Sequence, residues 1–426
     1  MPTSTAEGLR DFVRAADDAA YVASATAETP RSTFIVDLYS PLAEARRKAT
    51  VHPTTQASLT GKQDYRTQKE FADVSFTCVL GFDHAQQALV DERLSSKIWD
   101  LTIGQVWGHS IIGMDGDEHR HYRALIAQAF TRKSLSRWQQ TAIEPAVHGL
   151  IDRFEKAGSA DLYRDFTVLF PVYIITEMMA LPFDEIELFN KWAGETVGAF
   201  YDLDAAKIAS KKLEDYLSPL IEERRGGSGE DLITLLANAE LDGARLSTID
   251  IVSFLRLLLP AGGETTARST ANTLLGLLKN PDQLDALVDD RTLLPQTIEE
   301  GVRWEPPLMS ISRLALDDLE LGGVDIKRDS IVEVSIGAAN RDHTRWGDDA
   351  DDFDIFRDKK AHIAFAWGPH TCLGAHLARL EMTAAMTALF DRLPNLRLDP
   401  DRGRDAWVQG IGLRSPNKVP VVFGGR

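Results

Sequence analysis

Residues 247–279 are the stretch that most restricts how this chain can fold. Ser247 and Asp250 stand three residues apart, an arrangement typical of the N-terminal cap of a helix. The residues that follow are apolar on nearly every side of the predicted helix, Phe254 and Leu255 among them. A helix of this kind has to be buried on all sides, so it requires a large protein built around it.

The centre of this helix reads Pro-Ala-Gly-Gly-Glu-Thr-Thr over residues 260–266. Inside a helix a proline costs about 3 kcal/mol and each glycine about 1 kcal/mol relative to alanine. We therefore predict a distortion that frees backbone groups and makes room for a ligand. Glu264 and Thr265 lie beside it in apolar surroundings, where an acid needs a task or a partner. The alternative is a plain break between two helices, with Glu264 and Thr265 as a cap.

Three- and four-residue spacing of apolar side chains predicts that helices dominate the rest of the chain. Alternating patterns and a Gly-Gly turn predict a smaller β-rich part. The expected helices cover 37–48, 83–90, 117–130, 134–157, 161–180, 184–199, 205–225 and 375–391. The expected strands cover 75–81, 312–316, 319–321, 324–326, 331–335 and parts of 407–424. Residues 200–202 are expected to be another break between helices, one that could form the tip of a mobile lid.

A second informative stretch, 365–379, contains Cys372, one of only two cysteines in the chain. Gly368 precedes it and a helical pattern follows, so Cys372 is predicted where a tight loop turns into a helix. The first N–H groups of a helix favour a thiolate and lower the pKa of a thiol. Gly368 and Gly374 would let the backbone approach something flat or bulky. These features suit an axial metal ligand, and the alternative is a buried structural cysteine.

Three motifs in this chain resemble those of the cytochrome P450 family, in the same order, over about residues 37–424. The heme-binding signature Phe-x-x-Gly-x-His-x-Cys-x-Gly-x-x-x-Ala-Arg is matched at Phe365, Gly368, His370, Cys372, Gly374, Ala378 and Arg379. The family's central-helix motif, Ala/Gly-Gly-x-Asp/Glu-Thr, is matched at Ala261, Gly262, Glu264 and Thr265, with a less usual Pro260 before it. The family's Glu-x-x-Arg is matched at Glu300 and Arg303.

The resemblance implies a P450 fold, mainly α-helical with a small β-rich subdomain. In that fold, heme b lies between the long central helix and the cysteine-loop helix. Cys372 is then the axial ligand of the iron, and a thiolate there favours cleavage of the O–O bond. Thr265 is expected to assist the activation of dioxygen and to pass protons, with Glu264 helping to relay them. The other residues that the resemblance assigns to the heme are His119, Arg123, Arg313 and His370 for the propionates, and Phe365, Leu373, Gly374, Ala261 and Gly262 for packing.

The resemblance also implies a structural trio on the side of the cysteine, formed by Glu300, Arg303 and an arginine from the preceding loop, for which Arg357 is the candidate. The walls of the substrate pocket are assigned from their position relative to the motifs, and each could equally belong to the ordinary core. They are Trp107, Leu258, Ala261, Leu308, Met309 and Ile411. Because these side chains are apolar, the substrate is expected to be mostly hydrophobic.

The implied function is a monooxygenase that inserts one atom of O2 into a small organic molecule as a hydroxyl group. Two alternatives keep the same fold or cofactor. One is a peroxide-driven or rearranging enzyme, against which the Glu264–Thr265 pair argues. The other is a heme-binding sensor or carrier without turnover.

The formal net charge of −17 makes nucleic acid an improbable partner. The segment 119–137 is an exception, because it has several cations and no acid. Part of this basic island is assigned to heme propionates, and the alternative is a solvated helix face. The chain has no dinucleotide or flavin motif for a fused NAD(P)H-dependent reductase, so electrons are expected from a separate acidic ferredoxin. The cations expected to dock this ferredoxin are Arg120, Arg132 and Lys133 of the basic island, together with Lys359 and Lys360.

Residues 1–36 are predicted to be a peripheral segment and 37–426 a single catalytic domain. The first 29 residues are polar and lack an apolar core region, which argues against a secretory signal. No run of eighteen apolar residues is present, so no membrane anchor is expected. Two cysteines do not form a disulfide framework, and Cys78 is expected to be a small core residue. A monomer in the reducing cytoplasm is therefore predicted.

Overall fold

The computed structural model describes residues 35–62, 74–181, 186–197 and 202–424. Most of the predicted peripheral segment and most of the predicted break at 200–202 lie outside these residues.

The helices are α3 Tyr39–Lys48, α4 Gln56–Leu59, α5 Phe82–Val90, α6 Ile98–Thr102, α7 Gly104–Trp107, α8 Gly116–Ala127, α9 Arg132–Trp138, α10 Glu144–Ile151, α11 Phe170–Met178, α12 Ile186–Val197, α13 Leu203–Arg224, α14 Leu232–Asn238, α15 Thr248–Leu258, α16 Thr265–Lys279, α17 Pro281–Asp289, α18 Leu294–Trp304, α19 Ile336–Ala339, α20 His343–Trp346 and α21 Ala375–Arg392.

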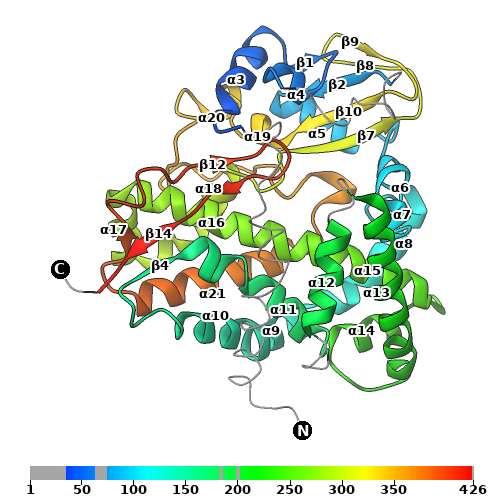
Figure 1. Ribbon diagram of the computed structural model, residues 1–426. Helices are drawn as coiled ribbons and strands as arrows, with labels where there is room; N and C mark the ends of the chain where they lie inside the picture. The colour runs from blue at the N-terminus through cyan, green and yellow to red at the C-terminus, as the bar shows by residue number, and fades with distance from the viewer. Residues whose placement is uncertain (1–34, 63–73, 182–185, 198–201, 425–426) are drawn as a thin grey trace.

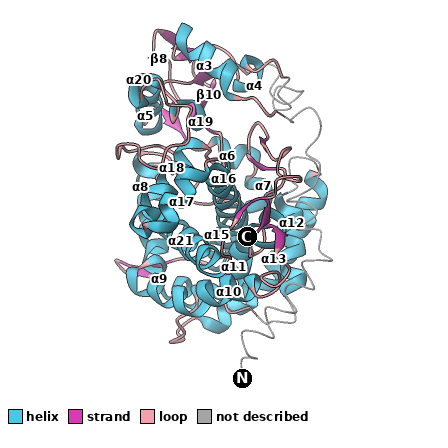
Figure 2. Cartoon of the chain, turned by 90° about the vertical axis from the view of Figure 1, so that its left-hand side faces the viewer, coloured by secondary structure: helices cyan, strands magenta, loops and turns pink. Residues whose placement is uncertain are grey.

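The predicted central helix consists of α15 and α16, joined by a π-helical segment over Leu259–Glu264. Ser247 caps α15, and its side chain and that of Asp250 each accept a hydrogen bond from the other residue's backbone N–H group. The wider π turn is the distortion that Pro260 and the two glycines predicted. The helix passes through the middle of the helical part of the molecule (Figures 1 and 2).

Two other long helices predicted from the sequence are interrupted. Residues 134–157 form α9, a π-helical segment over Gln139–Ile143 and then α10, which ends at Ile151. Residues 161–180 form a π-helical segment over Tyr163–Thr167 and then α11. In both cases a proline, Pro145 or Pro171, stands in the first turn of the helix that follows the irregular segment. A proline has no N–H group to continue the regular hydrogen-bond ladder, which accounts for a break at each place.

The strands gather mainly in one subdomain, seen at the top of Figure 1. Its five-stranded sheet has the order β1-β2-β10-β7-β3, in which β10 runs parallel to β2 and antiparallel to β7. The strands are β1 Val51–His52, β2 Phe76–Val79, β3 Leu94–Ser95, β4 Ser159–Asp161, β5 Glu240–Leu241, β6 Ala244–Arg245, β7 Ser310–Ala315, β8 Leu319–Leu321, β9 Val324–Ile326, β10 Ile331–Ser335, β11 Arg397–Leu398, β12 Val408–Gln409, β13 Ser415–Pro416 and β14 Pro420–Val422. The predicted boundaries of β8, β9 and β10 are correct.

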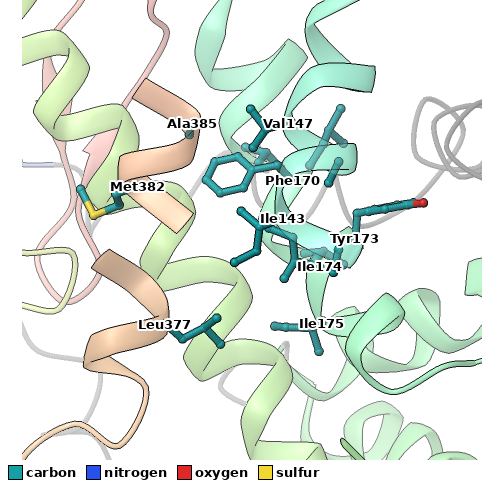
Figure 3. Close-up of a cluster of buried hydrophobic side chains, with 14 of the residues drawn as sticks. Ile143, Val147, Phe170, Tyr173, Ile174, Ile175, Leu377, Met382 and Ala385 are labelled. Carbon is teal, nitrogen blue, oxygen red and sulfur yellow. The ribbon is translucent and has the colours of Figure 1, made fainter. Parts of the chain in front are cut away.

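Three groups of buried apolar side chains hold the molecule together. The largest joins the helices, and Figure 3 shows the part of it where α10, α11 and α21 meet, with Val147, Phe170 and Leu377 among its side chains. A second group lies between the five-stranded sheet and α5. The third contains Cys78, which is fully buried as predicted. Among the described residues no helix has the length and apolar character needed to cross a membrane.

Candidate active site

Cys372 lies in the loop immediately before α21, as predicted. Its backbone N–H donates to the carbonyl of Phe365 at 2.8 Å, which closes the loop. The N–H groups of Gly374 and Ala375 donate to its sulfur. The thiol is exposed, although the loop packs against the main core through the half-buried side chains of Phe365 and Leu373. A thiol that is both exposed and closely surrounded by protein faces a space that a ligand can fill.

One prediction about this cysteine is wrong. The start of a helix was expected to lower its pKa, but burial raises the pKa of the Cys372 thiol, and the two N–H groups offset this only in part. The physical reason is that removing a thiolate from water costs more than two backbone dipoles return. A metal ion changes this balance, because a coordinating thiol loses its proton outright.

The loop before Cys372 contains a strained residue. Ala366 has a φ of +60°, in the left-handed region that costs a non-glycine residue about 1–2 kcal/mol. We expect Ala366→Gly to stabilise the protein by about 0.5–1 kcal/mol, because the relief of strain exceeds the entropy that glycine adds to the unfolded chain. Chemical denaturation measures the effect. Ala384→Gly within α21 is the matched control and should destabilise by about 1 kcal/mol. A destabilised Ala366→Gly variant would contradict this reading of the loop.

The central helix presents its predicted residues around the π-helical segment. The hydroxyl of Thr265 donates to the carbonyl of Ala261 at 2.5 Å, so it satisfies a carbonyl of the distorted turn. Ala261 is exposed although most of its neighbours on the helix, including Leu258, are buried. This exposure marks the side of the helix that no described side chain covers.

Two residues of this motif have surroundings that the sequence did not indicate. A Cβ on Gly262 would meet Ile175 Cδ1 at 3.0 Å, so this glycine also allows the close packing of α11. Glu264 is buried, and one of its carboxylate oxygens lies 3.9 Å from Arg268. Arg268 in turn donates to the hydroxyl of Ser415 at 2.8 Å.

The structure brings together the four residues predicted for the propionates. The rings of His119 and His370 stack with centroids 4.0 Å apart, and Arg123 donates to the carbonyl of Thr371 at 2.6 Å. Burial, together with the neighbouring charges of His370, Arg123 and Arg313, lowers the pKa of His119 to about 4. Burial likewise lowers the pKa of Arg313 to about 10. These lowered pKa values show that too little negative charge lies near the cluster to stabilise its cationic forms.

Asp115 is the carboxylate that acts on this cationic cluster, and the sequence analysis missed it. It lies 3.6 Å from His370 and accepts a hydrogen bond of 2.5 Å from Ser95. Burial alone would raise the pKa of Asp115, but the hydrogen bonds from His370 and Ser95 outweigh it and lower this pKa to about 2. Nε2 of His119 is buried and has no hydrogen-bond partner. The cluster therefore fits a ligand that carries further negative charge, as the two propionates of a heme would.

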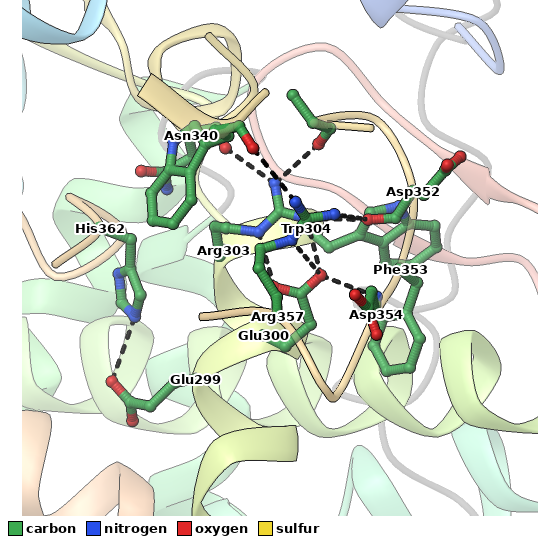
Figure 4. Close-up of polar contacts among 12 residues, drawn as sticks. Glu299, Glu300, Arg303, Trp304, Asn340, Asp352, Phe353, Asp354, Arg357 and His362 are labelled. Carbon is green, nitrogen blue, oxygen red and sulfur yellow. Dashed lines mark hydrogen bonds and ion pairs between the residues drawn. The ribbon is translucent and has the colours of Figure 1, made fainter. Parts of the chain in front are cut away.

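The predicted structural trio forms a buried network (Figure 4). Arg303 donates to both carboxylate oxygens of Glu300 at 2.7 Å and to the carbonyls of Asn340 and Ala350. Arg357 lies 3.5 Å from the same carboxylate. A buried pair such as this needs all its remaining hydrogen bonds satisfied, and the surrounding carbonyls satisfy those of Arg303. The network ties α18 to the segment that leads into the cysteine loop.

The predicted pocket walls divide into two groups. Trp107 and Leu308 are half-buried, Leu258 is largely buried, and Ala261 is exposed. Met309 is wrong as a pocket wall, because it is fully buried in the core that contains Cys78 and its methyl group leaves no room for a Cβ on Gly337. Ile411 packs against the same core. Their place in the chain relative to the motifs did not reveal that both pack with this core.

Comparison with known proteins gives one consistent result. The family model described as Cytochrome P450 matches residues 201–407. The chain is 35% identical over 336 residues to cytochrome P450 107B1 of Saccharopolyspora erythraea, covering 79% of this chain and 82% of that protein. It is 35% identical over 354 residues to the cytochrome P450 monooxygenase PikC of Streptomyces venezuelae, covering 80% and 84%.

Solved structures agree with the sequence comparison. Cytochrome P450 PksS of the Bacillus subtilis 168 bacillaene polyketide synthase has a TM-score of 0.81 at 28% identity, covering 91% of this chain and 97% of that one. CYP109E1 from Bacillus megaterium, in complex with testosterone, has a TM-score of 0.78 at 27% identity, covering 91% and 100%.

Proposed function

Because the chain belongs to the cytochrome P450 family, whose members are heme-thiolate monooxygenases, we propose that Cys372 holds the heme iron and that the enzyme hydroxylates a mostly hydrophobic small molecule. The observation that carries this proposal is the exposed Cys372 thiol, whose sulfur accepts two backbone N–H groups. The cluster of His119, Arg123 and Arg313 with His370 supports it, since it lacks the negative charge that two propionates bring.

A heme bound through a thiolate supplies the activation of dioxygen and the transfer of one oxygen atom to a C–H bond. The chain's own residues have simpler tasks. The N–H groups of Gly374 and Ala375 hold the sulfur, and Phe365 and Leu373 keep its surroundings apolar. The cationic cluster binds and orients the propionates.

The distorted turn carries a carboxyl and a hydroxyl group at adjacent positions of the sequence, Glu264 and Thr265. The Thr265 hydroxyl can exchange its hydrogen bond with the Ala261 carbonyl for one with a ligand, and thereby deliver a proton. Glu264 is the group that restores that proton to Thr265. Its contact with Arg268 is long enough, at 3.9 Å, to leave the carboxylate able to move.

The test is spectroscopic first and catalytic second. Carbon monoxide added to the reduced protein should give the absorption shift of a thiolate-bound heme. Turnover with NADH, a ferredoxin and its reductase should then yield hydroxylated product from ligands that displace water from the iron. Turnover that requires added peroxide would favour a peroxide-driven enzyme, and a thiolate spectrum without turnover of any spectrally active ligand would favour a sensor or carrier.

We propose that electrons come from a separate acidic ferredoxin that docks on the basic island. Arg132 and Lys133 are exposed at the start of α9, while Glu230 pairs with Lys133 and Arg137 and reduces the local positive charge. We expect the double variant Arg132→Glu, Lys133→Glu to slow the first electron transfer about tenfold at low salt, because steering depends on complementary charge. Stopped-flow reduction under carbon monoxide measures this rate.

The matched control is Arg328→Glu, an exposed residue between β9 and β10 in the sheet subdomain, which should leave the rate unchanged. The difference between the α9 double variant and the wild type should shrink as salt rises. Equal reduction rates for both proteins at low salt would contradict docking at this surface.

A further inference from the structure

A second ion pair on α18, next to the structural trio, contacts the cysteine loop directly. Glu299 accepts hydrogen bonds from Arg379 on α21 at both carboxylate oxygens, from Nε at 2.6 Å and from Nη2 at 2.8 Å. This two-point contact is the strong geometry for an arginine and a carboxylate. Burial alone would raise the pKa of Glu299, but the hydrogen bonds from Arg379 and His362 outweigh it and lower this pKa to about 2.

His362 orients the carboxylate from the other side (Figure 4). The backbone N–H of Ala364 donates to Nδ1 of His362 at 3.2 Å, so this nitrogen is the acceptor of the ring. The ring proton therefore lies on Nε2, which is 3.2 Å from Glu299 and donates to it. The His362 side chain is almost fully buried, so this contact has little freedom. Glu299 is thus held by two donors that come from different segments of the chain.

Arg379 contacts the loop around the sulfur both before and after Cys372. Its guanidinium lies 4.4 Å from the centre of the Phe365 ring, and Phe365 accepts the N–H of Cys372. Its Nη1 donates to the carbonyl of Ala375 at 3.5 Å, and the N–H of Ala375 donates to the Cys372 sulfur. Arg379 therefore contacts two residues, Phe365 and Ala375, whose backbone groups bond directly to Cys372. Besides Glu299, the partly exposed Arg379 side chain contacts the Ala375 carbonyl and the Phe365 ring within the described part of the chain, so Glu299 is its main anchor.

A fixed charge at this position acts on the iron through the sulfur. Reduction of a heme adds one negative charge to the iron and its thiolate. A nearby positive charge favours that change, and a negative one opposes it. Hydrogen bonding and charge around the ligand are among the means by which a protein sets the potential of such a centre. The positive charge of Arg379 acts on the Cys372 sulfur, and the Glu299 carboxylate is its counter-charge. The two partners therefore act on the sulfur with opposite signs.

We propose that Glu299, oriented by His362, is a positioning residue that holds Arg379 behind the Cys372 sulfur, and that this pair sets the reduction potential of the heme. The inference rests on the proposed role of Cys372 as the iron ligand. It gives Glu299 and Arg379, which lie outside the Glu300–Arg303–Arg357 network, a role in setting the reduction potential of the heme as well as in holding the loop.

The experiment measures the reduction potential of the intact heme protein by spectroelectrochemistry. Arg379→Gln removes the positive charge and should lower the potential. Glu299→Gln keeps an oxygen that accepts from Arg379 but removes the counter-charge, and it should raise the potential. Each shift should correspond to a three- to tenfold change in the reduction equilibrium, where tenfold is 59 mV for one electron. Arg379→Lys keeps the charge and should restore at least half of the shift seen in Arg379→Gln.

Opposite signs are the decisive feature, because a variant that merely loosens the cysteine loop would shift the potential in the same direction for either partner. Asp318→Asn, the same loss of charge in an exposed pair on the β8–β9 hairpin, is the matched control and should leave the potential unchanged. Shifts of equal sign, no shift in either variant, or no recovery in Arg379→Lys would overturn the proposal.

The carbon monoxide spectrum of each variant separates this inference from the proposed function. If the wild type lacks the spectrum of a thiolate-bound heme, the assignment of Cys372 fails and the inference fails with it. If wild type and variants all have that spectrum and equal potentials, Cys372 stands and only the role of Glu299 and Arg379 is refuted.

Discussion

Cys372→Ser is expected to abolish monooxygenase turnover, with a loss of at least about a thousandfold. A serine hydroxyl does not ionise at neutral pH and donates far less electron density than a thiolate, so O–O cleavage loses the push that the sulfur supplies. The N–H groups of Gly374 and Ala375 still point at the side chain in this variant, and the cationic cluster is unchanged. Heme can therefore bind, but the carbon monoxide complex should lose the absorption of a thiolate ligand.

Cys78→Ser is the matched control, since it makes the same atomic change at the chain's other cysteine. Cys78 is fully buried in the core beside the sheet, where a hydroxyl costs about 1–3 kcal/mol of stability. This variant should melt earlier but keep the thiolate spectrum and its turnover per heme. A Cys372→Ser protein with the wild-type spectrum would show that another residue binds the iron.

Thr265→Ala is expected to lower the ratio of product to NADH consumed by about tenfold, with hydrogen peroxide released in place of product. The variant removes the hydroxyl that now donates to the Ala261 carbonyl at 2.5 Å, the group that we propose delivers the proton. NADH oxidation should continue at a similar rate, because electron delivery does not use this residue. The measurement is the yield of product and of peroxide for a known amount of NADH.

Two controls accompany this variant. Thr265→Ser retains the hydroxyl and should keep most of the coupling. Thr270→Ala removes a hydroxyl that makes the same kind of bond, to the carbonyl of Thr266 at 2.8 Å, but is fully buried farther along α16, and it should leave coupling unchanged. Full coupling in Thr265→Ala would refute the assigned role.

Predictions from the sequence were most accurate where one local pattern decides the structure. The strands β8 and β9 have the predicted boundaries, because the Gly322–Gly323 turn, with φ values of +55° and +80°, leaves little choice of register. The distortion between α15 and α16 was predicted from Pro260 and two glycines for an equally local reason. The segments 134–157 and 161–180 were predicted to be single helices because their apolar spacing is regular. That spacing gave no sign of the breaks that accompany Pro145 and Pro171 in the structure.

Residues whose role depends on distant partners were predicted poorly or missed. Met309 was placed in the pocket, but it packs with Leu38 and Leu42 from the start of the described chain. Glu299 stands beside Glu300 and looks equivalent to it, yet the two carboxylates bind different arginines. The signal that could have found Glu299 is the pair of adjacent acids on one helix, since their side chains point in directions about 100° apart.

What the sequence by itself determined is the chemistry of the site. The motif around Cys372, the broken apolar helix with Glu264 and Thr265, and the family resemblance that they carry depend only on residue types at short spacings. The tertiary structure alone decided how charges compensate one another. It brought Arg313 from β7 to His119 on α8 and left Asp115 as the acid acting on them, and it paired Arg379, which contacts the cysteine loop, with Glu299. The physical reason is that Coulomb energies depend on distance and burial, and neither quantity is encoded in a local stretch of sequence.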